Sequence, residues 1–393
     1  MATTPAPPSP DPLARHYLDH ASTSPPRPEV VRAMVHWLEQ TAAADPGRVH
    51  TEGRIVRAVV EDARARVAAL LGTRPRQVVF TSGGTEAANA ATWGATRARR
   101  GMPVLLAAVE HSCVRDASGR LAPVVELAVD ATGRIEVAGV EDALRRCAGA
   151  GTPPALVHCQ AANHEVGTVQ PVAEVVELCH RHGVWVHVDA CALAGHLPVD
   201  FDELGADLLS VSAHKFGGPP GAGALLVRRG LRLDPLLVGG EQERARRAGL
   251  ENVPAILGFA AAAELLTAPG ALASEAAEAR RRTSLLLEAA TAVHGVEAVG
   301  DPDHRLPHLV CVTVDGVEAE PVLLGLDQRG IAAHSGSSCS SESLAPSAVL
   351  EAMGVDAERS LRLSVGWSTT DEDVNAFADV FSEVVERLRS LRA

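Results

Sequence analysis

Lys215 is the only lysine among the 36 lysine and arginine residues of this 393-residue chain. Arginine replaces lysine on a solvated surface at little cost, but its guanidinium stays protonated and forms no stable imine. A single lysine in an arginine-biased chain therefore indicates an amine nucleophile of the kind that forms Schiff bases. Chance survival is the alternative, and the residues around Lys215 argue against it.

Polar side chains follow several short apolar runs that are predicted strands, at the point where each run ends. The run QVVFT at 77–81 is followed by Ser-Gly-Gly-Thr, whose Gly84 and Thr85 open a predicted helix and form a candidate phosphate cradle. The other polar residues at such ends are His111, Gln160, Asn163, His164, Asp189, Ser212, His214 and Lys215. Because ligands bind at the carboxyl ends of strands in open α/β sheets, these residues are predicted to share one site.

Asp189 ends the apolar run VWVHV and is flanked by Val188 and Ala190. A carboxylate in such a place is costly to bury unless it has a cationic partner. A protonated pyridine nitrogen would be such a partner, and keeping that nitrogen protonated makes pyridoxal phosphate (PLP) an electron sink. Phosphate cradle, strand-end aspartate and strand-end lysine together indicate PLP chemistry.

Cys339 differs from the other six cysteines, which lie in strand-like or helix-like surroundings and are typical of small buried apolar residues. It lies in the small polar run HSGSSCSSES, which has little to pack and is predicted to be mobile and solvated. A cysteine in such a segment is a candidate second nucleophile.

The elements that must position these residues alternate between strand and helix patterns. Strands are predicted at 77–81, 103–109, 155–159, 184–190, 207–213 and 222–227, with helices at 54–71, 137–148 and 170–182. This alternation predicts an α/β fold with a mainly parallel sheet. After about residue 254 the pattern changes to helices at 254–266 and 272–294, a strand at 309–314, a helix at 319–329, a strand at 361–365 and a helix at 371–391. That part predicts a smaller α+β domain.

The net charge, the cysteine spacing and the histidines argue against several kinds of function. The net charge of −13 and the lack of a long basic run disfavour nucleic-acid or anionic-membrane binding. The seven cysteines lack paired CxxC spacing, so neither a zinc ribbon nor a disulfide framework is expected, and a reducing, cytoplasmic setting is predicted. Three histidines near one another in sequence (182, 187 and 196) raise a metal site as an alternative, but His187 alternates with apolar strand residues and is typical of a core histidine. No metal is therefore expected.

These residues resemble the class V aminotransferase group of fold-type I PLP enzymes, and within it the NifS/IscS-like cysteine desulfurases. The matching motifs are YLDHA at 17–21, TSGGTE at 81–86, EH at 110–111, NHEVG at 163–167, HVDA at 187–190, SAHK at 212–215, SGSSCSS at 335–341 and RLS at 362–364. The resemblance implies a large domain with a mainly parallel seven-stranded sheet and a smaller α+β C-terminal domain. We predict a proline-rich disordered tail at 1–14, a PLP-binding domain at 15–255 and a small domain at 256–393, with the Cys339 loop at 334–345.

The resemblance also implies a role for each site residue. Lys215 would form the Schiff base and move the Cα proton, Asp189 would pair with the pyridinium nitrogen, and His111 would stack on the ring and act as acid or base. The phosphate would be held by Gly84, Thr85, Ser212 and His214. Asn163, which also contacts the cofactor, and Arg362 would hold the substrate carboxylate. Cys339 would attack the sulfur of cysteine, retain it as a persulfide and release alanine.

The implied partners are L-cysteine, a second copy of the chain, and a sulfur acceptor such as an iron–sulfur scaffold or a thiolation enzyme. Three positions depart from the usual motif: Ala192 in place of a glutamine, Leu250 in place of a phosphate-binding threonine, and Trp367 in place of an arginine. These departures keep open a PLP-dependent C–S lyase or selenocysteine lyase. A catalytically silent scaffold is a further alternative.

Overall fold

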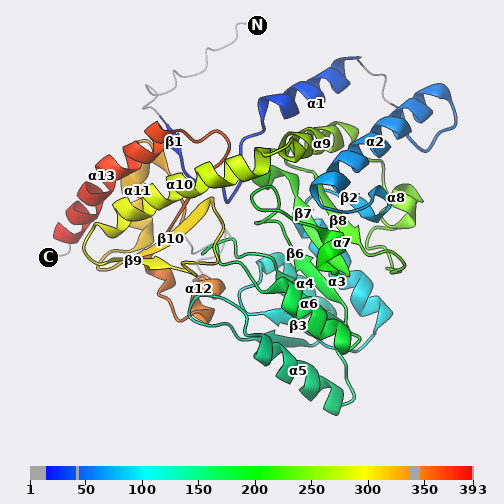
Figure 1. The fold of residues 1–393 in the computed structure, drawn as a ribbon, viewed down its shortest axis with the longest axis horizontal. Coiled ribbons are helices and arrows are strands. Elements are labelled where there is room, and N and C mark those ends of the chain that lie inside the picture. The colour runs from blue at the N-terminus through cyan, green and yellow to red at the C-terminus, as the bar shows by residue number, and fades with distance from the viewer. Residues whose placement is uncertain (1–14, 41–43, 336–345, 392–393) are drawn as a thin grey trace, which may run out of the picture.

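The computed structural model describes residues 15–40, 44–335 and 346–391. A seven-stranded sheet of order β2-β8-β7-β6-β5-β3-β4 forms its centre (Figure 1). Strand β8 runs antiparallel to β2 and β7, and the other neighbouring pairs are parallel. The strands are β2 (Val78–Thr81), β3 (Val104–Ala107), β4 (Val124–Leu127), β5 (Leu156–Gln160), β6 (Val186–Asp189), β7 (Leu208–Ser212) and β8 (Gly223–Val227). The expected seven-stranded, mainly parallel sheet is confirmed.

Strands β2, β3, β5, β6, β7 and β8 are buried throughout, as expected where helices cover both faces of a sheet. The six strands predicted from apolar runs are these six. The seventh, β4, was not predicted from its sequence VVEL. It is an edge strand and partly exposed, so it lacks the continuous apolar run of the others.

Helices and short 3-10 turns connect the strands of this sheet. They are α1 (Pro28–Gln40), α2 (Thr51–Leu70), η1 (Pro75–Gln77), α3 (Gly84–Ala98), α4 (Ser112–Leu121), α5 (Val137–Gly149), α6 (Val172–Arg181), α7 (Phe201–Leu204), η2 (Ala213–Phe216), α8 (Gln242–Ala245) and α9 (Val253–Thr267). The helices predicted at 54–71, 137–148, 170–182 and 254–266 are α2, α5, α6 and α9. Helix α9 is apolar nearly all round because it packs on α1, α2 and the buried Phe216.

The second region of the chain begins with α10 (Ala271–Thr291). It continues through β9 (Val296–Val299), β10 (Leu309–Val314), α11 (Ala319–Asp327), β11 (Ile331–Ala332), α12 (Ala348–Ala352), η3 (Ala357–Arg359), β12 (Ser360–Ser364) and α13 (Asp371–Ser390). Strands β12, β10 and β9 form a three-stranded antiparallel sheet. Strand β1 (His16–Tyr17) pairs with β11, which brings the start of the described chain into this region.

The described residues form three hydrophobic clusters: the first and third lie mainly around the seven-stranded sheet, and the second lies mainly in the second region. Leu18 lies in the second cluster, together with residues of α10, β10, β12 and α13. Helix α9, however, contributes Ile256 and Phe259 to the first cluster, although we predicted a boundary at residue 255. The exact division into domains stays a prediction.

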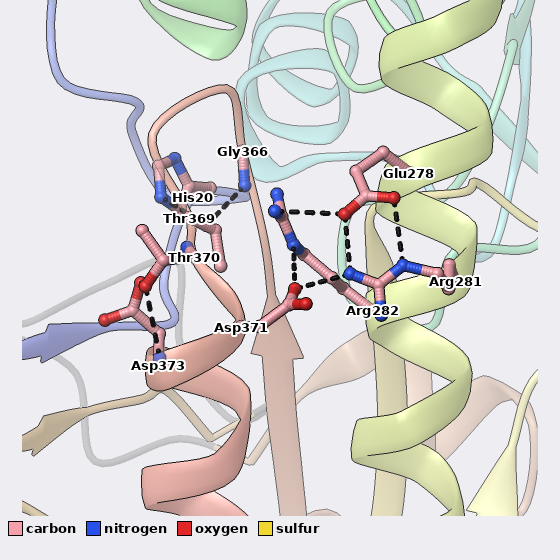
Figure 2. Close-up of polar contacts among 9 residues, drawn as sticks. All are labelled: His20, Glu278, Arg281, Arg282, Gly366, Thr369, Thr370, Asp371 and Asp373. Atoms are coloured by element: carbon pink, nitrogen blue, oxygen red, sulfur yellow. Dashed lines mark hydrogen bonds and ion pairs between the residues drawn. The ribbon is translucent and has the colours of Figure 1, made fainter.

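Exposed ion pairs join α10 to the start of α13. Figure 2 shows Arg281 and Arg282 of α10 between Glu278 of the same helix and Asp371, the first residue of α13. Thr370 caps α13 through a reciprocal pair of hydrogen bonds with Asp373. We name the four ion-paired residues 278, 281, 282 and 371 the α10–α13 junction.

Within the described ranges, no single helix has the length and apolar character needed to cross a bilayer. Helices α9 and α10 reach that length and composition only when counted together, and they are bent by 84° at their break.

Candidate active site

The polar residues predicted at the strand ends meet in one pocket at the carboxyl edge of the sheet. Seven of the ten predicted site residues line it, namely Gly84, Thr85, His111, Asp189, Ser212, His214 and Lys215. The other lining residues are Cys113, Gln160, Ala162, His164, Cys191 and Ala192. No sequence pattern had singled out Cys113, which reaches the pocket because it lies in the first turn of α4 after His111.

Lys215 lies in η2, immediately after β7, and its side chain is partly buried. Its Nζ donates hydrogen bonds to the carbonyl oxygens of Ala21 at 2.7 Å and Ser22 at 3.0 Å. The neighbouring His214 contacts Thr23 Oγ1 at 3.1 Å through its Nδ1. Residues 21–23, from the start of the chain, therefore form the wall against which the lysine is held.

The start of α3 forms the opposite end of the pocket. The first N–H groups of a helix have no acceptor within the helix, and its dipole favours an anion at this end. Gly84 begins α3, and a Cβ atom there would lie 2.4 Å from Cys191 Sγ, so a side chain at this position would require the Cys191 thiol to move. Thr85 and Ser212 add hydroxyl groups to the same end of the pocket. This arrangement suits a phosphate group.

Asp189 ends β6 on the pocket floor. Its Oδ1 accepts hydrogen bonds from the Cys191 N–H and the Ser210 hydroxyl, both at 3.0 Å. Burial alone would raise its pKa, but the neighbouring histidines and the Cys191 hydrogen bonds hold the pKa below the usual carboxyl value. The side chain is therefore ionised at neutral pH, as a partner for a cationic ring nitrogen must be.

Two buried histidines lie on neighbouring strands below this floor. His158 and His187 are opposite each other in the β5–β6 register, and their Nδ1 atoms are 2.8 Å apart. Burial lowers the pKa of His187 to about 4 and that of His158 well below its ordinary value, so both rings are neutral at pH 7. His187, one of the three histidines considered as metal ligands, is thus a hydrogen-bonded core residue.

His111 forms the N-cap of α4, where its Nδ1 accepts a hydrogen bond from the Cys113 N–H at 3.1 Å. Nδ1 is therefore unprotonated, and the ring proton of the neutral imidazole lies on Nε2. The ring of His164 lies beside it, with the centroids 4.9 Å apart and a tilt of 58° between the planes. The cap fixes the direction in which the His111 ring enters the pocket.

A second carboxyl group, that of Glu110, is buried just behind the pocket. Its Oε1 accepts a hydrogen bond from the Gln160 N–H at 2.6 Å, while Oε2 has no hydrogen-bond partner among the described residues. Burial, reinforced by the charge of Asp189, raises the pKa of Glu110 to about 8. At neutral pH the two carboxyl groups thus differ, since Asp189 is ionised and Glu110 is protonated.

Asn163 and Arg362, the remaining two predicted site residues of the described chain, do not line the pocket but lie behind it. The Asn163 side chain accepts hydrogen bonds from the N–H groups of Glu165 and Val166, both at 2.8 Å, and so shapes the turn after β5. Arg362 donates to the His164 carbonyl oxygen at 2.9 Å and forms an ion pair with Asp19 at 2.8 Å. Its Nε is buried without a hydrogen-bond partner among the described residues.

Cys339 lies outside the described residues, and so do most of its predicted loop and the predicted tail. The three departures from the motif lie in different surroundings. Ala192 lines the pocket, and Leu250 is 64% exposed at the surface. Trp367 donates to the Pro25 carbonyl oxygen at 2.8 Å and lies against the guanidinium of Arg27.

The pocket brings together an amine, an ionised carboxylate, an imidazole and a helix N-terminus that begins at a glycine. These groups match the aldehyde, the ring nitrogen, the ring face and the phosphate of PLP in kind and number. Fold and pocket together define the class, which is that of the PLP-dependent enzymes with an α/β fold.

The chain belongs to the aminotransferase class-V family, whose model matches residues 16–377. It is 37% identical over 388 residues to the cysteine desulfurase IscS of Dictyoglomus turgidum, and the match covers 95% of each chain. A solved structure of a NifS-like protein matches with a TM-score of 0.86 and 29% identity, over 95% of this chain and 100% of the other. The structure of SspA in complex with cysteine matches with a TM-score of 0.77 and 29% identity, over 89% and 98%. Enzymes of this family depend on PLP, and PLP is the cofactor of this chain.

Proposed function

We propose that this chain is a PLP-dependent cysteine desulfurase, which converts L-cysteine to L-alanine and retains the sulfur as a persulfide on Cys339. The observation that carries the proposal is the pocket in which Lys215 and Asp189 meet, in a chain similar over nearly its whole length to a curated desulfurase. The match to a structure with bound cysteine supports L-cysteine as the substrate.

Each residue that holds the cofactor has a chemical reason for its role. Lys215 Nζ would be the covalent attachment point, and it would move the proton of the substrate Cα. Asp189 keeps the ring nitrogen protonated, because its carboxylate is ionised and buried. Bound PLP supplies an electron sink that stabilises negative charge on the substrate Cα. Gly84, Thr85, Ser212 and His214 would hold the phosphate at the helix end of the pocket, while Asn163, buried behind the pocket, holds the turn after β5 in shape.

Arg362 binds the substrate carboxylate, with Asn163 supporting the site. The unpartnered Nε of Arg362, buried among the described residues, supports this role, because a buried donor without an acceptor costs stability that a bound carboxylate would restore. His111 would stack on the cofactor ring and would transfer protons through Nε2, since the helix cap occupies Nδ1.

Replacing the proposed sulfur nucleophile tests the function directly. Wild-type protein should form alanine from cysteine, and in the presence of a thiol reductant it should release sulfide in equal amount. Cys339→Ala should keep the visible absorbance of bound PLP but lose alanine formation by more than about 100-fold, because the attacking thiolate is gone. If Cys339→Ala keeps full activity, the persulfide route is wrong and a C–S lyase or selenocysteine lyase reaction replaces it.

The same proposal includes a homodimer, an unidentified sulfur-acceptor protein and a cytoplasmic location. Exposed apolar residues support the dimer, since they are costly to leave in water; they are Val31, Val35 and Leu38 on α1, and Leu237, Val238 and Leu250 near α8. Cys159, Cys179 and Cys311 are buried as free thiols, which supports a reducing compartment. Sedimentation analysis should give twice the chain mass, and a Leu38→Glu, Val238→Glu double variant should shift it to the monomer.

A further inference from the structure

His164 and Glu165 are connected to both described flanks of the segment 336–345. On the first flank, the backbones of His334 and Arg362 exchange hydrogen bonds of 2.7 and 3.3 Å, and Arg362 Nη1 donates to the His164 carbonyl oxygen at 2.9 Å. On the second flank, the Ser347 hydroxyl donates to Glu165 Oε2 at 2.5 Å. Ser347 also caps α12 by accepting a hydrogen bond from the Leu350 N–H at 3.2 Å. The chain segments that lead to and from the Cys339 region therefore converge on one histidine–glutamate pair.

The imidazole of His164 belongs to the pocket. It lines the pocket together with Lys215 and lies beside His111. Its Nε2 is 3.4 Å from Glu165 Oε1, and the two side chains are only 11% and 8% exposed. A carboxylate this close to a buried imidazole orients the ring and stabilises its protonated form.

Hydrogen bonds from Asn163 and its neighbours hold the turn that carries this pair in shape. Asn163 Oδ1 accepts hydrogen bonds from the N–H groups of Glu165 and Val166, and the Gly167 N–H donates to the Asn163 carbonyl oxygen at 3.1 Å. The His164 ring is thus held at a defined place in the pocket.

We propose that His164, oriented by Glu165, is a second acid/base residue of the pocket and serves the sulfur atom of the substrate; this inference rests on the proposed desulfurase function. In the step, the thiolate of Cys339 forms an S–S bond to the substrate sulfur, and the bond between that sulfur and Cβ breaks. The electron pair of the broken bond stays with Cβ. His164 accepts the proton of the substrate thiol and returns it to Cβ, which becomes the methyl group of alanine. The persulfide remains on Cys339 as an anion, and no other reactant is needed.

This assignment divides the proton transfers among three residues. Lys215 serves Cα, His111 acts at the cofactor ring, and His164 serves sulfur and Cβ. Loss of His164 should therefore slow alanine formation without affecting the exchange of the substrate Cα hydrogen.

The test compares His164→Asn, Glu165→Gln and, as a control, His182→Asn at the exposed end of α6. For each PLP-loaded protein, alanine formation and deuterium exchange at the Cα of cysteine are measured between pH 6 and 9. His164→Asn should lower alanine formation about 100-fold while Cα exchange stays within twofold of wild type. Glu165→Gln should move the acidic limb of the alanine profile to lower pH, because a neutral amide no longer stabilises the imidazolium. His182→Asn should match wild type.

A second measurement does not depend on turnover. In full-length protein with ¹³C-labelled histidine, NMR titration should show the His164 pKa falling in Glu165→Gln, with and without PLP. Equal loss of alanine formation and Cα exchange in His164→Asn would indicate a merely structural role and overturn the inference, as would wild-type alanine formation in that variant. If wild-type protein itself forms no alanine from cysteine, it is the desulfurase function that fails, while the titration still tests the pair.

Discussion

The cofactor pocket and the α10–α13 junction both contain many charged and polar side chains, but the two regions differ in whether these side chains have hydrogen-bond and ion-pair partners. At the junction, Arg281, Arg282, Glu278 and Asp371 all have ion-pair partners (Figure 2), and all of them except the partly buried Arg282 are exposed. In and around the pocket, Glu110 Oε2, His187 Nε2 and Arg362 Nε are buried and have no hydrogen-bond partner among the described residues.

This difference indicates that the polar side chains of the junction have a structural role, whereas those in and around the pocket have a functional one. A buried polar atom without a partner costs about 1–3 kcal/mol, whereas exposed ion pairs contribute little because water screens them. The three unpartnered atoms thus cost stability in the cofactor-free protein, and of the three only Arg362 Nε is proposed to gain a partner, when the substrate carboxylate binds. Changes in the pocket should alter chemistry and pH dependence strongly, and changes at the junction should alter neither.

The largest effect is expected for Asp189→Asn. The amide oxygen still accepts the hydrogen bonds from Cys191 and Ser210, but the negative charge opposite the cofactor ring is lost. Turnover of cysteine should fall by about 100- to 1,000-fold, measured as alanine formed per PLP-loaded chain. An unchanged rate would contradict the assignment of Asp189 to the ring nitrogen.

Asp207→Asn is the matched control for this change. Asp207 is also a buried carboxylate, but it precedes β7 at the other edge of the sheet, where it pairs with Arg228 and His180. This variant should lower thermal stability while each folded, PLP-loaded molecule keeps wild-type turnover.

An intermediate effect is expected for the pH dependence of stability in Glu110→Gln. The pKa of Glu110 is raised from 4.5 to about 8, so its contribution to stability is complete below pH 4.5 and is lost as the pH rises toward 8. Over this pH range the free energy of unfolding of the wild-type protein falls by about 5 kcal/mol. The variant does not show this fall, because the glutamine side chain does not ionise. Melting curves of the cofactor-free proteins should therefore diverge from pH 5 to pH 9, with wild type falling further.

Glu86→Gln provides a control of opposite sign. The pKa of Glu86 is lowered: burial opposes the shift, but hydrogen bonds from Arg247 and Ser82 outweigh it. Its contribution is present above pH 4.5 and is lost only in acid, so the melting curves of this variant and wild type should differ by a constant amount from pH 5 to 9. Parallel curves for Glu110→Gln as well would show that Glu110 is not protonated at neutral pH.

The smallest effect is expected at the junction. Arg281→Gln removes the exposed contacts with Glu278 and Asp371. The melting temperature should change by less than about 2 °C, and the change should vanish in about 1 M salt, because screening already weakens such pairs. A larger, salt-independent change would mean that the junction does more than link the exposed faces of α10 and α13.

Much of the fold could be predicted because its elements carry local signals. The continuous apolar runs of the buried strands and the helical periodicity of α2, α5, α6 and α13 depend only on neighbouring residues in the chain. Strand β4 was missed because an edge strand does not need an apolar run. The packing of α9 on α1 and α2 could not be predicted from the sequence of α9 alone, since it depends on residues far away in the chain.

The sequence by itself determined the chemistry available to this protein: one amine at Lys215, one strand-end carboxylate at Asp189 and a glycine turn at Gly84, in the order of a class V aminotransferase. Residue type and position relative to a strand suffice for that, because parallel strands end at a common edge. The protonation states and partners were decided only by the tertiary structure. Glu110 keeps its proton at neutral pH because its side chain is buried and because the charge of Asp189 disfavours a second negative charge nearby. His164 faces the pocket with Glu165 behind it because β5, β12 and α12, which are remote in sequence, meet at that point.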